Sequence, residues 1–319
     1  MTLMLLDAAS MYFRAYFGVP ESMTAPDGTP VNAVRGFLDM TARLVSSRRP
    51  THLVACLDED WRPAFRVAAI SSYKEHRLAT GSAVAEETPD TLAPQVPILL
   101  DVLAAMGIAC EGSPGFEADD VIGTLATAAT GPVEVVTGDR DLFQLVRDEP
   151  PIRILYIARS VAKLEVLGPA EVAAKYGIPG TAYADFAALR GDPSDGLPGV
   201  PGVGDKTAAA LITAFGSLER LLAALDATEA TRTLSGVSPS VRAKLRAARP
   251  YLDVAPTVVD IRRDAPVRRN LHTALPAVPR DPEALLELSD RWGLDTSVGR
   301  LLQACQSVLG TTQAASDQV

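Results

Sequence analysis

Three short apolar runs in the first half of the chain each lead into an aspartate, and this pattern restricts the fold more than any other feature. The runs are Leu3–Leu6 before Asp7, Leu53–Leu57 before Asp58, and Val133–Thr137 before Gly138 and Asp139. Helical patterns occupy residues 33–46, 94–106 and 118–129, and residues 152–157 are a candidate fourth strand. Strands separated by helices of this length predict an α/β domain over residues 1–180, with a parallel sheet covered by helices on both faces.

Further acids lie near these strand ends or in the second half of the chain. They are Glu117, Asp119 and Asp120 at the start of a helical pattern, Asp141 after the third strand, and Asp192 and Asp195 in a glycine-bounded turn. The carboxyl ends of parallel strands share one edge of a sheet, and ligands bind there. We therefore expect the acids to converge on one cleft.

So many carboxylates in one cleft repel one another unless cations compensate them. Mg²⁺ and Mn²⁺ prefer oxygen ligands, and two such ions about 3.5–4 Å apart can hold a phosphodiester for hydrolysis. The three histidines, at positions 52, 76 and 272, do not neighbour the acids, which argues against zinc. Taken singly, each acid could instead cap a helix or begin a turn, and for Asp120 that interpretation weighs as heavily as the metal one.

The rest of the chain departs from the strand–helix alternation. Residues 61–93 form a long excursion with a basic first half, which is typical of a functional lid or a disordered loop. Residues 181–260 read as a second, helical domain that contains the glycine-rich hairpin Gly199–Gly204. Residues 261–310 are irregular and then helical, and residues 311–319 are small and polar, so we expect a disordered tail there.

Net charge, cysteine content and the length of apolar runs further restrict the class of protein. The formal net charge is −9, which alone argues against a nucleic-acid partner, although the distribution of charge matters more than its sum. The three cysteines are far apart and predict buried free thiols. No apolar run approaches the roughly 18–20 residues of a membrane span, and the N-terminus lacks signal-peptide features. We expect a cytoplasmic monomer without a membrane segment.

Several segments carry a recognisable set of motifs. They are Leu6-Asp7 with Phe13–Tyr16, Asn32–Phe37, Pro50–Val54, Phe65-Arg66 with Tyr73–Arg77, Glu117–Leu125, Val136–Asp141, and Leu189–Ala208. On these motifs the chain resembles the 5′-3′ exonuclease domain of bacterial DNA polymerase I, and more broadly the flap endonucleases, over about residues 1–300. The resemblance implies a PIN-like parallel or mixed sheet, a helical arch over 61–93, a helix-hairpin-helix-type domain over 181–260, and a region at 261–310 that packs back on the core. It also implies a free-standing form, without polymerase domains, from a bacterial cell.

The same resemblance implies an activity, namely 5′-3′ exonuclease and 5′-flap endonuclease cleavage of DNA in replication and repair. The implied metal ligands are Asp7, Asp58, Glu117, Asp119, Asp120, Asp139, Asp141, Asp192 and Asp195. They would hold two or three Mg²⁺ or Mn²⁺ ions, and hairpin carbonyls would bind a K⁺ ion. The expected partners are DNA with 5′ flaps, free 5′ ends, nicks or gaps, together with the polymerase and ligase that process the same DNA.

Basic and aromatic residues supply the expected substrate contacts. Lys74 and Arg77 are one helical turn apart, so we expect them to share a face and to neutralise the scissile phosphate as a catalytic pair. Tyr12, Phe13 and Tyr73 are candidates for stacking on an unpaired base, although for each taken singly the core interpretation outweighs stacking. The predicted DNA-binding set is Arg14, Arg35, Arg66, Tyr73, Gly202, Gly204, Lys206 and Thr207.

The chain departs from the family pattern at three positions. Gly196 replaces the usual asparagine, Ala8 a glycine, and Leu57 a phenylalanine. We expect Gly196 to loosen the turn that holds Asp195, because glycine adds backbone freedom. Two other functions stay open at this point: a DNA-binding or scaffolding relative that does not cut, and a PIN-type ribonuclease with a similar acidic sheet edge.

Overall fold

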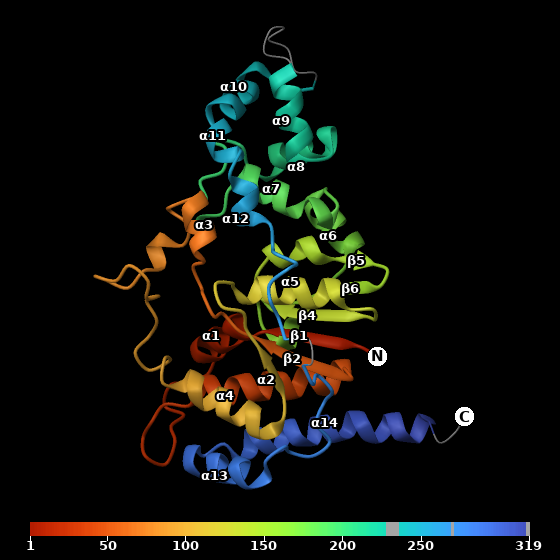
Figure 1. The fold of residues 1–319 in the computed structure, drawn as a ribbon. Coiled ribbons are helices and arrows are strands. Elements are labelled where there is room, and N and C mark those ends of the chain that lie inside the picture. The colour runs from red at the N-terminus through yellow and green to blue at the C-terminus, as the bar shows by residue number, and fades with distance from the viewer. Residues whose placement is uncertain (228–235, 269–270, 317–319) are drawn as a thin grey trace.

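The computed structural model describes residues 1–227, 236–268 and 271–316, and a mixed β-sheet forms its centre (Figure 1). Within these residues the strand order is β3-β2-β1-β4-β6-β5, and β7 pairs with β6. The strands are β1 (Leu3–Asp7), β2 (His52–Cys56), β3 (Ala109–Glu111), β4 (Val133–Thr137), β5 (Arg147–Asp148), β6 (Pro151–Tyr156) and β7 (Glu165–Leu167). β1 is paired in parallel with both β2 and β4, so the first strand of the chain lies inside the sheet.

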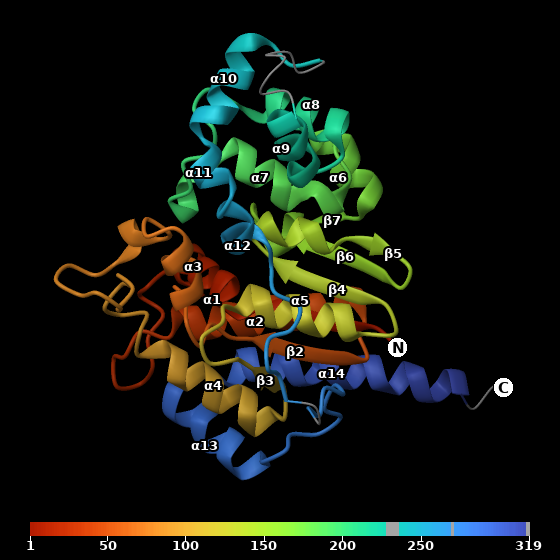
Figure 2. The same ribbon diagram turned by 45° about the horizontal axis from the view of Figure 1, so that its top comes forward.

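Two groups of helices cover the sheet. One face carries α1 (Ala8–Gly18), α2 (Asn32–Arg48), α4 (Gln95–Met106), α13 (Pro282–Trp292) and α14 (Asp295–Ser316). The other carries α5 (Ala118–Ala128), α6 (Pro169–Tyr176), and α7 (Tyr183–Arg190) to α12 (Ala255–Val259). In Figures 1 and 2, α13 and α14 lie beside α4 and α2 at one end, and α8 to α11 form the opposite end. The predicted α/β fold is confirmed.

Strand alternation sends side chains to both helical layers. Leu5 of β1 packs into the α5 layer, whereas Met4 and Leu6 pack into the α2 layer, and all three are fully buried. This alternation follows from the period of two in a β-strand. Both layers are apolar, and Asp7 and Thr137 are the last residues of β1 and β4.

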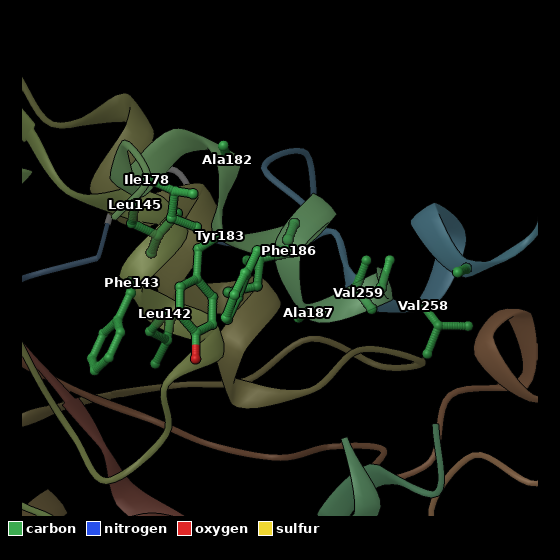
Figure 3. Close-up of a cluster of buried hydrophobic side chains, with 14 of the residues drawn as sticks. Leu142, Phe143, Leu145, Ile178, Ala182, Tyr183, Phe186, Ala187, Val258 and Val259 are labelled. Carbon is green, nitrogen blue, oxygen red and sulfur yellow. The ribbon is translucent and has the colours of Figure 1, made fainter. Parts of the chain in front are cut away.

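Helices α7 to α12 extend the apolar core that lies against the sheet. Phe143 of the 3₁₀ helix η2 (Asp141–Leu145) contacts Tyr183 of α7, with ring centroids 5.3 Å apart, and Tyr183 contacts Phe186 at 5.7 Å. Figure 3 shows these rings together with Val258 and Val259 of α12 in one buried cluster. Four helices lie between α7 and α12 in the described part of the chain: α8 (Asp205–Phe215), α9 (Leu218–Ala227), α10 (Pro239–Ala247) and α11 (Arg249–Leu252). The second half is thus fixed to the sheet through a shared apolar core.

Two sequence-based expectations were wrong in part. Of the predicted helical arch, only α3 (Ala64–Ala69) and the 3₁₀ helix η1 (Glu75–Arg77) are helical, and a β-bridge joins Leu78 to Glu86. Lys74 and Gly81 have positive φ angles of +50° and +79°, which a right-handed helix cannot contain. The predicted disordered tail is helical through Ser316, as the last part of α14, and 317–319 lie outside the described residues.

Two further sequence-based expectations concern the cysteines and membrane-spanning helices. The cysteines at positions 56, 110 and 305 are free thiols, as predicted. No single helix among the described residues is long and apolar enough to span a bilayer. Helices α8 and α9 reach that length and hydrophobicity only together, and they are bent by 77° against each other.

Candidate active site

Three neighbouring parallel strands deliver carboxylates to one edge of the sheet. Asp7 is the last residue of β1, Asp58 follows β2 by two residues, and Asp139 follows β4 by two residues. Glu117 and Asp119 at the start of α5 reach the same place. These five acids line one cavity of about 250 Å³, together with Glu86 and the basic side chains of Arg14, Lys74 and Arg77. The expected convergence of acids from distant parts of the chain is therefore present.

Asp7 is the most deeply held of the strand-end acids. Its Oδ1 accepts the backbone N–H of Ser10 at 3.0 Å, which caps α1, and its Oδ2 accepts the hydroxyl of Thr137 at 2.7 Å. Burial raises the pKa of Asp7 to about 7, and the charges of Asp58 and Asp139 add to that rise. Asp7 thus caps α1 and also lines the acidic cavity.

Asp119 and Asp141 face other acids at close quarters. Burial raises the pKa of the Asp119 carboxyl well above its usual range, with Asp139, Asp7 and Glu117 contributing in that order. The pKa of Asp141 is raised in the same way, by burial and by Asp139, Asp195 and Asp192. In addition, one buried carboxylate oxygen of Asp141, Oδ1, has no hydrogen-bond partner. Such a group lacks a compensating cation or donor.

Asp192 and Asp195 lie in the turn after α7, within the 3₁₀ helix η5 (Pro193–Asp195) and its first flanking residue. Asp192 forms ion pairs with Arg190 at 3.2 Å and with Arg140 at 3.7 Å. Asp195 pairs with Arg77 at 3.2 Å. Both acids are almost fully buried and raise the pKa of Asp141, and Arg77 links Asp195 to the cavity that it lines.

Glu117 and Asp120 are held by a buried arginine. Arg66 binds Asp120 in a bidentate pair with both distances at 2.7 Å, and it also contacts Glu117. The backbone N–H of Arg262 donates to Asp120 Oδ1 at 2.8 Å, and that of Glu117 to Oδ2 at 3.2 Å. Because both oxygens of Asp120 are occupied and its side chain is 0% exposed, the predicted ligand role of Asp120 is wrong.

The same contacts overturn two predicted DNA contacts. The side chain of Arg66 is 3% exposed and donates to Val258 O as well as to the two acids, so it has no surface for DNA. Tyr73 is also 3% exposed, and its hydroxyl donates to Glu117 at 2.9 Å. Tyr73 is therefore a core residue that orients Glu117 and is not a stacking platform.

Lys74 and Arg77 reach the acids, but not from one face of a helix. Lys74 has a left-handed backbone with φ of +50° and precedes η1, which is too short for the predicted helical face. The Lys74 ammonium pairs with Glu117, and its side chain is 13% exposed. The Arg77 guanidinium donates to Asp195 and to the carbonyl of Ser194. Both cations thus face the acidic cavity from the excursion at 61–93.

The donor set fits hard divalent cations. Every ligand candidate around the cavity is an oxygen, which suits Mg²⁺ or Mn²⁺. In the described part of the chain, no three His, Cys, Asp or Glu side chains surround one point as metal ligands do, and Glu117, Asp192 and Asp195 turn towards basic partners. The unpartnered oxygen of Asp141 and the raised pKa of Asp7 and Asp119 show that these partners leave the acids under-compensated. The residues present therefore fit such ions.

The other predicted DNA contacts divide into two groups. Gly202, Gly204 and Lys206 are exposed at the hairpin before α8, and Thr207 is half-buried on its first turn. Arg14 borders the acidic cavity and donates to Ala158 O at 2.8 Å. Arg35 instead donates to the carbonyl of Gly293 at 2.7 Å, which ties α2 to the C-terminal helices, so its predicted DNA contact is not supported.

Sequence reasoning missed three residues at these places. Glu86 lines the cavity and has a pKa raised by burial, yet it lies in the flexible-looking part of the excursion. Arg140, between the two aspartates after β4, could have been noticed because it alone separates them. Lys244 of α10 lies at the hairpin, with its ammonium 3.4 Å from the carbonyl of Gly202, and no local signal marks it.

Comparison with known proteins gives the chain a family. The sequence matches the 5′-3′ exonuclease N-terminal resolvase-like domain over residues 2–177 and the 5′-3′ exonuclease C-terminal SAM fold over residues 178–282. The chain belongs to the 5′-3′ exonuclease family. A 5′-3′ exonuclease of Streptomyces coelicolor is 57% identical over 302 residues, which are 94% of this chain and 98% of that protein. One of Mycobacterium tuberculosis is 52% identical over 319 residues, with 97% and 99% covered.

The chain also matches part of longer relatives and shares its fold with solved structures. DNA polymerase I of Bacillus caldotenax is 34% identical over 272 residues, which are 84% of this chain and 29% of the polymerase. The fold is similar to that of the T5 D15 protein crystallised with metal ions, with a TM-score of 0.61, 16% identity, and 97% and 99% of the two chains covered. It is also similar to the catalytic core of Rad2 in complex with DNA substrate, with a TM-score of 0.57, 15% identity, and 97% and 91% covered.

Proposed function

We propose that this member of the 5′-3′ exonuclease family is an enzyme that hydrolyses DNA phosphodiesters at 5′ flaps and free 5′ ends, using two divalent cations, Mg²⁺ or Mn²⁺. The observation that carries the proposal is the cavity in which Asp7, Asp58, Glu117, Asp119 and Asp139 face Lys74 and Arg77. Carboxylates alone would repel a phosphodiester, and basic residues alone would not need so many acids. The combination suits a phosphate held between cations.

The acids divide by position into two sets. Asp7, Asp58, Glu117, Asp119 and Asp139 would hold one cation beside the strand ends. Asp141, Asp192 and Asp195 would hold the second, and a third cation would need to share ligands with both sets. When bound, the cations supply charge that polarises the scissile phosphate and lowers the pKa of the attacking water.

The chain's own cations handle the phosphate. Lys74 and Arg77 are paired with Glu117 and Asp195, at the border of the cavity. Once divalent cations compensate these acids, the ammonium and the guanidinium are free to donate to phosphate oxygens as negative charge develops. Arg14, which lines the same cavity, would hold the next phosphate. These three residues orient the substrate and stabilise the transition state.

The hairpin before α8 would hold the duplex. The N-cap of the 11-residue helix α8 is Gly204, which has no side chain to cap the helix. The backbone N–H groups at the start of α8 are therefore open to a phosphate. Lys206 and Lys244 add positive charge. Phosphate contacts carry no base information, so binding would be independent of sequence.

A K⁺ ion at the hairpin carbonyls belongs to the same proposal, although the Lys244 ammonium already lies beside the carbonyl of Gly202. Duplex affinity should be compared in KCl and NaCl for the wild type and for Lys244→Ala. A preference for K⁺ in either protein supports the ion, and equal affinities in both salts remove it from the proposal.

Cleavage of a 5′-flap DNA substrate with Mg²⁺ or Mn²⁺ tests the function. Asp119→Asn and Asp139→Asn should reduce the cleavage rate at least about a hundredfold, since each removes a cation ligand, and should leave duplex binding nearly unchanged. Asp148→Asn, at a surface pair with Arg153 far from the cavity, is the matched control. Absence of cleavage with any divalent cation would favour a binding module, and preference for an RNA flap would favour a PIN-type ribonuclease.

The cellular setting is proposed as well. We propose a cytoplasmic monomer in a bacterial cell that acts beside a polymerase and a ligase on flaps, nicks and gaps. The bacterial relatives carry the same family name. Light scattering of the purified chain tests the monomer, and co-purification from bacterial lysate on flap DNA tests the protein partners. Anomalous scattering from Mn²⁺-soaked crystals counts the cations.

A further inference from the structure

The segment of residues 71–77, which carries Lys74 and Arg77, is attached to the acidic turn 192–197 mainly through the backbone. The N–H of Lys74 donates to the carbonyl of Asp195 at 2.9 Å. The hydroxyl of Ser72 donates to the carbonyl of Gly196 at 3.1 Å, and Arg77 Nη2 donates to the carbonyl of Ser194 at 2.7 Å. Arg77 also donates to the Asp195 carboxylate at 3.2 Å, so two stretches more than a hundred residues apart share four hydrogen bonds within a few residues.

Gly196 is the point of closest approach between the two stretches. A Cβ atom at this position would lie 2.3 Å from the carbonyl oxygen of Ser72 and 3.5 Å from the nitrogen of Lys74. The first distance is far below van der Waals contact, and the obstructing atom belongs to the backbone, so it cannot rotate away as a side chain could. Gly196 also has a φ of +71°, which favours glycine. Only glycine allows this contact without moving the segment.

The opposite side of the segment is held by Arg62. Its Nε donates to the carbonyl of Tyr73 at 2.6 Å and its Nη2 to that of Ser71 at 2.7 Å. The segment is therefore clamped between Arg62 and the acidic turn. Lys74 itself has an unfavourable left-handed backbone with φ of +50°, which persists only where surrounding contacts fix it. The position of its ammonium beside Glu117 depends on this clamp.

We propose that Gly196 is a positioning residue of the site, which acts through Lys74. Its lack of a side chain lets the Lys74 segment seat on the acidic turn, so that the Lys74 ammonium and the Asp195 carboxylate reach the cavity together. This role rests on the proposed nuclease function for its catalytic consequence, but the seating itself is a property of the protein without substrate. It is the reverse of the looser turn that glycine at this position would suggest.

Gly196→Ala tests the proposal, with Gly177→Ala as the matched control. Gly177 has a φ of +73°, and a Cβ there would meet nothing within 4 Å, so both variants carry the same backbone penalty and only one carries the collision. Hydrogen exchange of the peptide covering residues 70–78, without DNA or metal, should become at least tenfold faster at the Lys74 amide in Gly196→Ala alone. Unchanged exchange in Gly196→Ala would overturn the proposal.

A double-mutant cycle with Lys74→Ala then tests the route of action. Gly196→Ala should lower kcat for flap cleavage about 10–100-fold, with duplex affinity unchanged, but should have little further effect in the Lys74→Ala background. Fully additive losses would overturn action through Lys74. If the enzyme cuts no substrate, the exchange result still decides whether Gly196 seats the segment, so this inference and the proposed function fail separately.

A milder variant covers the case in which Gly196→Ala does not fold. Ser72→Ala removes one hydrogen bond to the carbonyl of Gly196 without any steric change, and Ser71→Ala is its neighbouring control. We expect severalfold faster exchange at Lys74 and severalfold lower kcat in Ser72→Ala only. Equal behaviour of the two serine variants would count against the seating.

Discussion

Replacement of Lys74 by methionine should move metal binding and DNA cleavage in opposite directions. Lys74 is paired with Glu117 on the border of the acidic cavity, where it occupies a carboxylate that divalent cations need. Methionine keeps much of the apolar stem and removes the charge. The protein without DNA should then bind Mn²⁺ more tightly, because a competing cation has been removed.

The magnitude follows from the charges around the cavity. Its lining contains three basic and six acidic side chains, namely Arg14, Lys74, Arg77, Asp7, Asp58, Glu86, Glu117, Asp119 and Asp139. A single ammonium about 8 Å from a divalent cation opposes it by about 1 kcal/mol at the dielectric constant of water and about 4 kcal/mol at an effective value of 20. The Lys74 side chain is partly exposed, so we expect a value near 1.4 kcal/mol, or about tenfold tighter Mn²⁺ binding.

The assay pairs calorimetric titration of Mn²⁺ into the DNA-free protein with flap cleavage under saturating Mn²⁺. Cleavage should fall about 10²–10³-fold, as for loss of one donor to a developing negative charge. Lys175→Met is the control, because Lys175 forms a surface pair with Glu165 at 2.9 Å away from the cavity. Weaker or unchanged Mn²⁺ binding in Lys74→Met would refute the idea that Lys74 competes with the metal.

Three further outcomes are expected. Asp120→Asn should destabilise the protein by about 3–5 kcal/mol in urea unfolding, because it leaves the buried Arg66 guanidinium partly unpaired, and an unchanged midpoint would contradict a structural role. Burial raises the pKa of Asp7 to about 7, above its unfolded value, so in EDTA the neutral carboxyl stabilises the fold below about pH 4 and that contribution is lost as the pH rises to 7; Asp7→Asn should flatten this part of the profile of Tm against pH. Tyr183→Phe should stabilise the protein by about 1 kcal/mol, since the buried Tyr183 hydroxyl has no partner, whereas a loss of stability would reveal one.

Much of the sheet could be predicted because the residues that end its strands lie next to those strands in the sequence. The strand at Val133–Thr137 has the predicted bounds, and Gly138 follows its last residue. By contrast, α1 begins at Ala8, directly after β1, with Asp7 as its cap. Without an intervening turn, the periodicities of strand and helix overlap in one short window, so the helix could not be recognised from the sequence.

The acidic residues show where sequence reasoning stops. Strand ends and the start of a helix can be placed on one sheet edge from the pattern alone, and Asp7, Asp58 and Asp139 do meet there. Neighbouring helical positions, however, point about 100° apart, so Asp119 and Asp120 cannot both face the cavity. The arginine that takes Asp120 is 54 positions away in the chain, and only the folded structure reveals that pair.

The position of β1 inside the sheet has a consequence for biosynthesis. The residues that form β1 leave the ribosome first, yet one neighbour of β1 is β4, which ends at Thr137. Strand pairing in the order of synthesis would leave one side of Asp7 without its neighbour until more than a third of the polypeptide has emerged. A nascent chain thus lacks the complete acidic edge, and a ribosome-bound fragment shorter than about 140 residues should be unable to attack the DNA or RNA around it.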